Sequence, residues 1–149
     1  MGAFFAIILF LVVIAIIIWQ FSHQALAKKT IIIPQSLPPE GFLVPFTAAR
    51  FGLSDMANKE GNRFNTNMKL FDDHFDFNVI NNHSYKYPEV KDIGYMDGYY
   101  GRVTLVVTFN GADNNYYGYT YKNNLKEIFK FFQGKACKLT EKAQSFISQ

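Results

Sequence analysis

Apolar and polar positions form three successive patterns along this chain: an unbroken apolar run, then stretches of alternation, then a helical stripe. The run covers residues 3–18 and contains no polar side-chain atom. As a helix it would be about 24 Å long at 1.5 Å per residue. A helix without a polar face is not typical of the core of a small globular protein, so the run needs another explanation.

Three roles are open for this run. About 17 apolar residues can cross a hydrocarbon core, and Trp19 follows where an interfacial aromatic belongs, which favours a retained transmembrane helix. Residues 25–27 read Ala-Leu-Ala, as at a signal-peptidase site, so a leader cleaved before Lys28 is the alternative. A helix that packs against copies of itself is the third role. We predict a membrane anchor built by Ala3, Phe4, Phe5, Ile7, Ile8, Leu11, Ile14, Ile18 and Trp19.

Such an anchor predicts a single-pass membrane protein that contacts membrane lipid. Two observations disagree about the side on which the rest of the chain lies. Lys28 and Lys29 come directly after the span, and the positive-inside rule would place the globular domain in the cytoplasm. The Ala-Leu-Ala motif instead predicts export. We expect the globular domain on the exported, periplasmic side.

We assign residues 1–29 to the anchor and its flank, residues 30–41 to a linker and residues 42–149 to one globular domain. Pro34, Pro38 and Pro39 exclude a helix in the linker, although residues 31–33 could add a short strand. What remains of the 149 residues after the run is enough for one modest core and too short for two comfortable domains.

Alternation predicts three strands in the globular domain, at residues 74–81, 101–109 and 117–121. The last two are expected to form a hairpin, because Asn110 and Gly111 are a turn signal. Two short helices are predicted at residues 46–51 and 54–60, each followed by a glycine, and residues 81–100 are predicted to be rich in turns.

The helical stripe near the end places residues 125, 128, 129 and 132 on one face, with Asn123 or Asn124 as the cap and Gly134 at the end. A second apolar stripe covers residues 136–147. Together the patterns predict an α+β fold, in which an N-terminal transmembrane helix is followed by a small antiparallel sheet with C-terminal helices packed on it.

Composition and the absence of known motifs in the sequence argue against several classes of function. The net charge is only +3 and the lysines are dispersed, so nucleic acid is not expected as a partner. The single cysteine cannot form an internal disulfide, and no zinc-type Cys/His spacing occurs. No phosphate-binding loop, dinucleotide fingerprint, nucleophile elbow or zinc-protease motif is found. We therefore expect a protein without cofactor or enzymatic activity.

Three polar groups remain as candidate sites. Asp72, His74 and Asp76 would share one face of a strand and could bind a divalent metal, or they form a solvated strand face. Residues 113–115, Asp-Asn-Asn, offer oxygen ligands that suit calcium, or they form a polar hairpin loop. Cys137 is either a reactive thiol near a helix N-terminus or a small side chain on a packed helix.

A row of tyrosines is the stronger candidate for an interaction site. Tyr117, Tyr119 and Tyr121 alternate along the last predicted strand and would share one face. Exposed tyrosine is enriched at protein interfaces. These three side chains are predicted to bind a partner, unless they complete or shield the core.

Four stretches of the chain are similar to parts of the type IVb pilins, the subunits of some bacterial pili. They are FTAARFGLSDMANKEGNRF (residues 46–64), FDFNVI, GRVTLVVTFNG and GKACKLTEKAQSF (residues 134–146). The resemblance implies a helix and loop, then core strands, then a final helix. The chain lacks the family's basic leader, its glutamate at the position of Ile7 and the second cysteine that would pair with Cys137. The resemblance, without these three features, therefore implies a pilin-like domain that docks partners rather than an ordinary filament subunit.

The sequence predicts a non-enzymatic, single-pass membrane-anchored interaction or assembly subunit with a pilin-like domain. Its expected partners are other protein subunits, in a homo-oligomer or a hetero-assembly. Two alternatives stay open. One is a small accessory subunit of a membrane-embedded respiratory or secretion complex. The other is an exported metal-binding protein or enzyme that uses the face of Asp72, His74 and Asp76.

Overall fold

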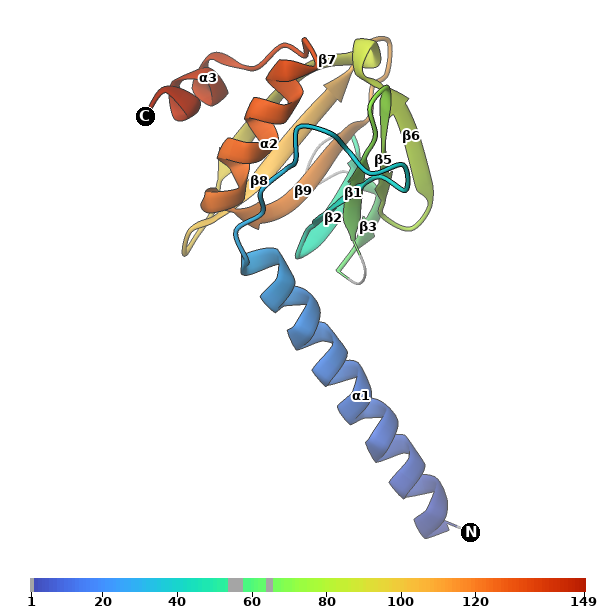
Figure 1. Ribbon diagram of the computed structural model, residues 1–149. Helices are drawn as coiled ribbons and strands as arrows, with labels where there is room; N and C mark the ends of the chain where they lie inside the picture. Colours follow the sequence, from blue (N-terminus) through green and yellow to red (C-terminus); the bar gives the residue numbers. More distant parts are fainter. Residues whose placement is uncertain (1, 54–57, 64–65) are drawn as a thin grey trace.

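A 27-residue helix, α1 (Gly2–Lys28), begins the chain and projects away from the remainder of the molecule (Figure 1). The computed structural model describes residues 2–53, 58–63 and 66–149. We call residues 30–149 the head. Residues 30–41 form a linker without helix or strand, and Leu37 of this linker is buried in the core of the head.

The transmembrane anchor predicted from the sequence is not supported. Across the residues that the structure describes, no helix combines the length and the apolar character needed to span a membrane. The predicted single-pass membrane location and signal anchor are therefore wrong.

The larger sheet of the head has five antiparallel strands in the order β3-β2-β9-β8-β7. Their bounds are β2 (Ala48–Gly52), β3 (Asn58–Asn62), β7 (Val90–Asp97), β8 (Arg102–Phe109) and β9 (Asn115–Tyr121). The predicted strands at residues 101–109 and 117–121 are confirmed, and they form the predicted hairpin. In this pairing Val107 lies opposite Tyr116 and Leu105 lies opposite Gly118.

A second sheet has four antiparallel strands in the order β1-β4-β5-β6. Their bounds are β1 (Phe42–Pro45), β4 (Asn67–Leu70), β5 (His74–Asn78) and β6 (Asn82–Lys86), and the short 3-10 helix η1 (Tyr87–Glu89) follows them. The strand predicted at residues 74–81 is confirmed as β5 over residues 74–78. The predicted fold class had one small sheet, so the second sheet is a further correction.

The two sheets enclose an aromatic core. Phe75 and Phe77 of β5 and Tyr116 of β9 are almost completely buried, and Phe109 of β8 stacks on Tyr85 with 3.9 Å between ring centroids. Phe77 lies at the centre of this core, 4.5 Å from the Tyr116 ring. Gly118 is required beside them, because a Cβ atom there would lie 2.6 Å from the Phe46 ring.

The helix α2 (Lys122–Gly134) covers the part of the five-stranded sheet that the second sheet leaves open (Figure 1). Phe132 of α2 packs edge-on against Phe75, and Phe129 packs against Tyr95 of β7. The helix α3 (Glu141–Ser148) follows and adds Phe146 to the same group of rings. The predicted helix and its end at Gly134 are confirmed, but the second stripe is helical only from residue 141.

Residues 138–140 protect the edge strand β7. Ile93 donates its backbone N–H to Lys138 at 2.9 Å and accepts from Thr140 at 2.9 Å, which forms a short parallel bridge. Unpaired strand edges promote association with other chains, so this segment closes an edge that would otherwise be open.

Several local predictions are wrong. Residues 48–51 of the first predicted helix lie in the strand β2, and residues 58–60 of the second lie in β3, while residues 54–57 lie outside the described residues. Residues 81–100 contain β6, η1 and β7 rather than mainly turns. Residues 31–33 form no strand. Tyr121 is the N-cap of α2, because Asn123 and Asn124 bind the linker instead.

Replacing Phe77 with alanine should lower the free energy of unfolding by about 3–5 kcal/mol, because it opens a cavity between the two sheets. The matched control is Ile80→Ala, whose side chain is 63% exposed and whose loss should change stability by less than about 0.5 kcal/mol. Urea unfolding followed by circular dichroism measures both values. Equal effects of the two substitutions would contradict the placement of Phe77 in the core.

Candidate functional site

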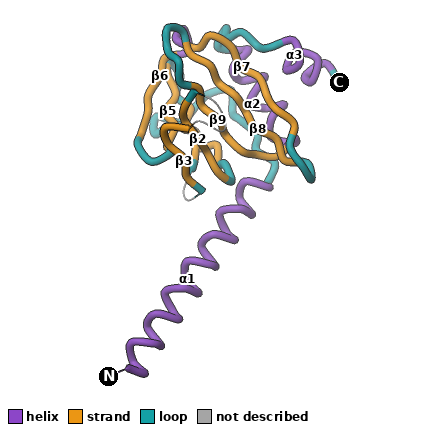
Figure 2. Tube along the Cα trace, turned by 180° about the vertical axis from the view of Figure 1, so that it is seen from behind, coloured by secondary structure: helices purple, strands orange, loops and turns teal. Residues whose placement is uncertain are grey.

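Among the residues that the structure describes, no helix and no strand of the second sheet covers one face of the five-stranded sheet. In Figure 2, which shows the molecule from behind, β7, β8 and β9 lie in front of α2. We call this side the outer face. Strand alternation sends Tyr116, Gly118 and Thr120 of β9 to the core, so Tyr117, Tyr119 and Tyr121 lie on the outer face, as their spacing predicted.

The three predicted tyrosines differ in what surrounds them. Tyr117 is only 6% exposed, and its hydroxyl oxygen accepts a hydrogen bond from Asn115 at 3.3 Å. Tyr119 is half-buried, and the guanidinium of Arg50 lies 5.5 Å from its ring centroid. Tyr121 is half-buried, and the ammonium of Lys28 lies 6.0 Å from its ring centroid. Two of the three rings therefore carry a cation.

The turn between β7 and β8 presents two more tyrosines. Tyr99 and Tyr100 are 87% and 99% exposed. Arg102 donates its backbone N–H to the carbonyl of Tyr99 at 3.1 Å, and φ is 56° at Tyr100 and 74° at Gly101. Two central residues with positive φ define a type I′ turn, in which asparagine or glycine is favoured and tyrosine is strained. The turn therefore presents an aromatic ring at a conformational cost.

A hollow of about 500 Å³ connects this turn to the sheet. It is lined by the turn residues 98–100 together with Arg102, Val103, Thr104 and Tyr119. We call the outer-face residues Arg50, Arg102, Thr104, Tyr117, Tyr119 and Tyr121, with Tyr99 and Tyr100 of the turn, the tyrosine face. Tyrosine and arginine are the side chains that the tyrosine face shares with many protein interfaces.

The predicted metal site is not assembled. His74 contacts Asp73 at 2.6 Å and lies 3.8 Å from Asp76, but Asp72 is turned toward Lys135, 3.4 Å from its ammonium. In the described part of the chain, no three His, Cys, Asp or Glu side chains converge as metal ligands would. Asp113, in the predicted polar loop at residues 113–115, belongs to no such group.

Cys137 is a packed side chain. It is 7% exposed, and its Sγ lies 3.7 Å from the carbonyl oxygen of Tyr87. Burial raises the pKa of its thiol to about 11. A nucleophilic cysteine needs a lowered pKa, so Cys137 has the properties of a core residue rather than of a nucleophile.

Glu60 is the one buried acidic side chain among the residues that the structure describes. Its carboxylate accepts hydrogen bonds from the side chain of Asn81 at 3.0 Å and from the backbone of Asn81 at 3.2 Å, and it lies 3.1 Å from His83. Burial raises the pKa of Glu60, but these hydrogen bonds lower it more, and it falls to about 2. Glu60 lies in β3 and its partners lie at β6, so the group joins the two sheets and has no free proton to transfer.

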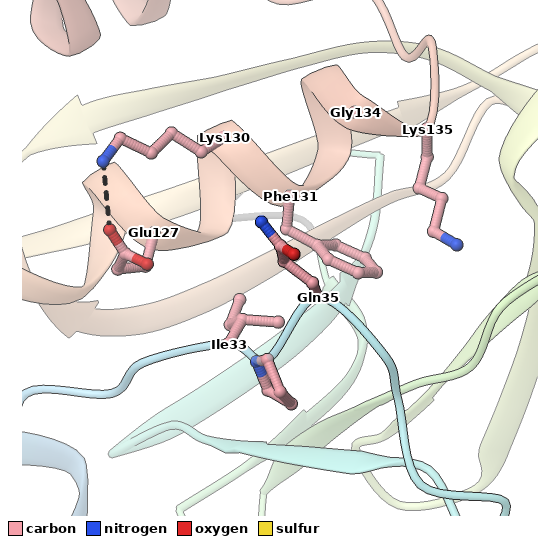
Figure 3. A pocket seen from close by; sticks show the side chains of 8 residues that line it. Ile33, Gln35, Glu127, Lys130, Phe131, Gly134 and Lys135 are labelled. Carbon is pink, nitrogen blue, oxygen red and sulfur yellow. Dashed lines mark hydrogen bonds and ion pairs between the residues drawn. The ribbon is translucent and has the colours of Figure 1, made fainter.

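A second groove lies between the linker and α2 (Figure 3). Ile33 and Gln35 of the linker lie opposite Phe131, and the groove has a volume of about 590 Å³. Its charged groups already have partners, because Lys130 contacts Glu127 at 3.3 Å and Lys135 binds Asp72. This groove is therefore the packing interface between the linker and α2.

The sequence pointed to the tyrosine strand but not to the whole tyrosine face. Arg50 joins it only because β2 pairs with β9, a pairing between segments that are distant in the sequence. Tyr99, Tyr100 and Arg102 join it through the turn. The run of Gly98 and Gly101 around two tyrosines was the available signal, since it indicates a tight turn with an aromatic tip.

Replacing Glu60 with glutamine should remove part of the acid sensitivity of folding. The pKa of Glu60 is lowered in the folded state, so its contribution is complete above pH 4.5 and is lost as the pH falls toward about 2. The difference in urea midpoint between wild type and variant should therefore shrink from pH 5 to pH 2. A difference that does not change over this range would show that Glu60 does not join the sheets as an anion.

Replacing Tyr100 with asparagine should raise the free energy of unfolding by about 1 kcal/mol, because asparagine tolerates the left-handed conformation of this turn position. Tyr99→Asn is the control, since Tyr99 is exposed but has no positive φ. Thermal unfolding of both variants tests this. A loss of stability in Tyr100→Asn would mean that the ring contributes to the fold.

Comparison with known proteins adds no relative: no family model matches this chain, and no curated protein matches it in sequence.

Proposed function

We propose that this protein is a non-enzymatic assembly subunit, in which α1 packs against the α1 helices of other copies. The observation that carries this proposal is the exposure of apolar side chains along α1. Phe5, Phe10 and Phe21 are 76%, 65% and 69% exposed, and between them most large apolar side chains are exposed as well. Soluble monomers rarely expose apolar patches of more than a few hundred Å².

The attachment of α1 to the head supports the same proposal. Asn123 donates its side-chain N–H to the carbonyl of Lys28 at 3.2 Å and to the hydroxyl of Thr30 at 2.9 Å. Asn124 accepts a hydrogen bond from the backbone of Ile31 at 3.0 Å. These bonds hold the end of α1 against the start of α2. A helix presented at a fixed angle loses less freedom when it packs against others.

No metal-ligating group is assembled in the described residues, and we therefore favour an assembly role over that of a metal-dependent enzyme. The resemblance to type IVb pilins also supports it, since those proteins are subunits of larger structures. We take only the assembly role from that resemblance, because residues 48–52 and 58–62, within the predicted helix-and-loop segment, pair as two strands.

Sedimentation velocity of the purified full-length chain tests the proposal. The wild type should sediment as a defined oligomer, well above the 17.1 kDa of one chain. A variant with Ile7, Leu11, Ile14 and Ile18 all replaced by glutamine should sediment as a monomer with the circular dichroism of a folded head. These positions lie on one side of α1, so the variant removes a continuous stripe of contact.

The matched control replaces four exposed apolar side chains of the head with glutamine: Ile32, Leu43, Leu53 and Ile80. This control also replaces four large aliphatic side chains, two isoleucines and two leucines, and it should assemble like the wild type. A monomeric wild type, or loss of assembly in the control as well as in the α1 variant, would contradict the proposal.

A further inference from the structure

The turn between β7 and β8 presents two tyrosine rings that their own chain leaves uncovered. Tyr99 and Tyr100 are 87% and 99% exposed, so the head gains almost no packing from either ring. The backbone of Tyr100 has a φ of 56°, a conformation that asparagine or glycine adopts with less strain. Strained positions of this kind cluster at binding and switch regions. The rings are therefore suited to contact a surface outside their own chain.

The turn lies at the end of the head from which α1 departs. Figures 1 and 2, which show the molecule from opposite sides, both place it beside the end of α1 and to one side of this helix. Two consecutive residues of α2 connect the turn to α1. Lys122 donates its backbone N–H to the carbonyl of Gly101 in the turn at 3.1 Å. Asn123 donates its side-chain N–H to the carbonyl of Lys28 at 3.2 Å, so the turn is held in place relative to α1.

A second α1 packed on this side of the first would pass close to the turn. Two hydrogen bonds and one step along the backbone separate Gly101 from Lys28, a distance on the order of 10 Å. The axes of packed helices are about 8–10 Å apart, which is the same scale. A neighbouring helix in contact with α1 on this side would therefore bring its side chains within reach of the two tyrosine rings.

The part of α1 nearest the head offers a surface that suits these rings. Ile18 and Phe21 are 60% and 69% exposed, and Phe21 lies about two helical turns before Lys28. Residues 5–21 of α1 contain no charged side chain. Tyrosine is favoured where its ring can pack on an apolar surface while its hydroxyl group stays in water. Two tyrosine rings at the edge of the head therefore match an apolar helix that passes beside them.

We propose that the turn of Tyr99 and Tyr100 docks on the α1 helix of a neighbouring copy of this chain. The two rings pack there on the apolar side chains around Ile18 and Phe21. This inference rests on the proposed function, because the helix that occupies the turn belongs to another copy in the same assembly. It adds a contact between head and helix to the contact between helices, so each copy is held at two places. The contact between helices already brings this occupant to the turn, which favours it over an unrelated partner.

Photo-crosslinking in the assembled full-length protein tests the proposal. Tyr99→Cys is labelled with a benzophenone maleimide, while Cys137 is 7% exposed and stays unlabelled. Irradiation should give a two-chain product whose crosslink lies within residues 14–21 of α1. The control is Lys86→Cys with the same label. Lys86 is exposed at the end of β6 that leads into η1, on the opposite side of the head from α1 (Figure 1), and the label there should give no crosslink to α1.

Two substitutions separate docking from folding. Tyr99→Ser and Tyr100→Asn should each raise the protein concentration at which half of the chains are assembled about tenfold, as measured by sedimentation velocity. Tyr100→Asn should raise the melting temperature at the same time, a combination that a structural role for the ring would not produce. Raised salt should not weaken the assembly of the wild type, because neither the two rings nor residues 5–21 of α1 carry a charge at neutral pH.

The outcomes distinguish this inference from the proposed function. If the wild type assembles but the label at residue 99 gives no crosslink to α1, the docking inference is wrong and the proposed function stands. The same conclusion follows if both tyrosine substitutions leave assembly unchanged, or if the label at residue 99 reacts only with the head of the neighbouring copy. If the wild type is monomeric at every concentration, the proposed function fails and the docking inference fails with it.

Discussion

One face of the five-stranded sheet has to be covered by two different partners, and the rest of the head depends on this constraint. The inward-facing side chains of β8 lie under α2 at the start of the strand and under the four-stranded sheet at its end, where Phe109 stacks on Tyr85. Phe75 contacts both partners, since it packs on Phe109 and on Phe132 of α2. The second sheet and the helix therefore form one continuous layer, and neither could leave without exposing the core of the other.

Because the inner face of the five-stranded sheet is covered in this way, side chains that could contact a partner can lie only elsewhere on the head. The inner side is filled by aromatic and aliphatic packing, and its buried acid, Glu60, is fully engaged in joining the two sheets. The groove between the linker and α2 has its charges paired. Polar and aromatic groups with free surface collect instead on the outer face, where the strands end in the turn of Tyr99 and Tyr100.

The sequence predicted the elements whose own pattern is strong and missed those that depend on distant contacts. The strands β5, β8 and β9 alternate clearly, so they were predicted correctly. The strand β2 begins with two alanines, which favour a helix in isolation, and pairing with β9 overrides that preference. Asn123 and Asn124 looked like helix caps, but their side chains are used by the linker.

The candidate site was predictable only in part for a related reason. Alternation placed Tyr117, Tyr119 and Tyr121 on one face, because that property is local to β9. No local pattern could bring Arg50 over Tyr119, since that contact requires the register between β2 and β9. Apolar character was likewise an incomplete guide to α1, because composition says that a helix must be covered but does not say by what.

The bonds between the linker and α2 also decide how the molecule carries mechanical load. Without them, tension on α1 would pass along the linker to β1, an edge strand of the four-stranded sheet, which could be peeled away one hydrogen bond at a time. Asn123 and Asn124 divert that tension into the first turn of α2. Because α2 packs along the inner face of the five-stranded sheet, a force on α1 would load the whole helix in shear. Such a force would leave the two sheets packed against each other.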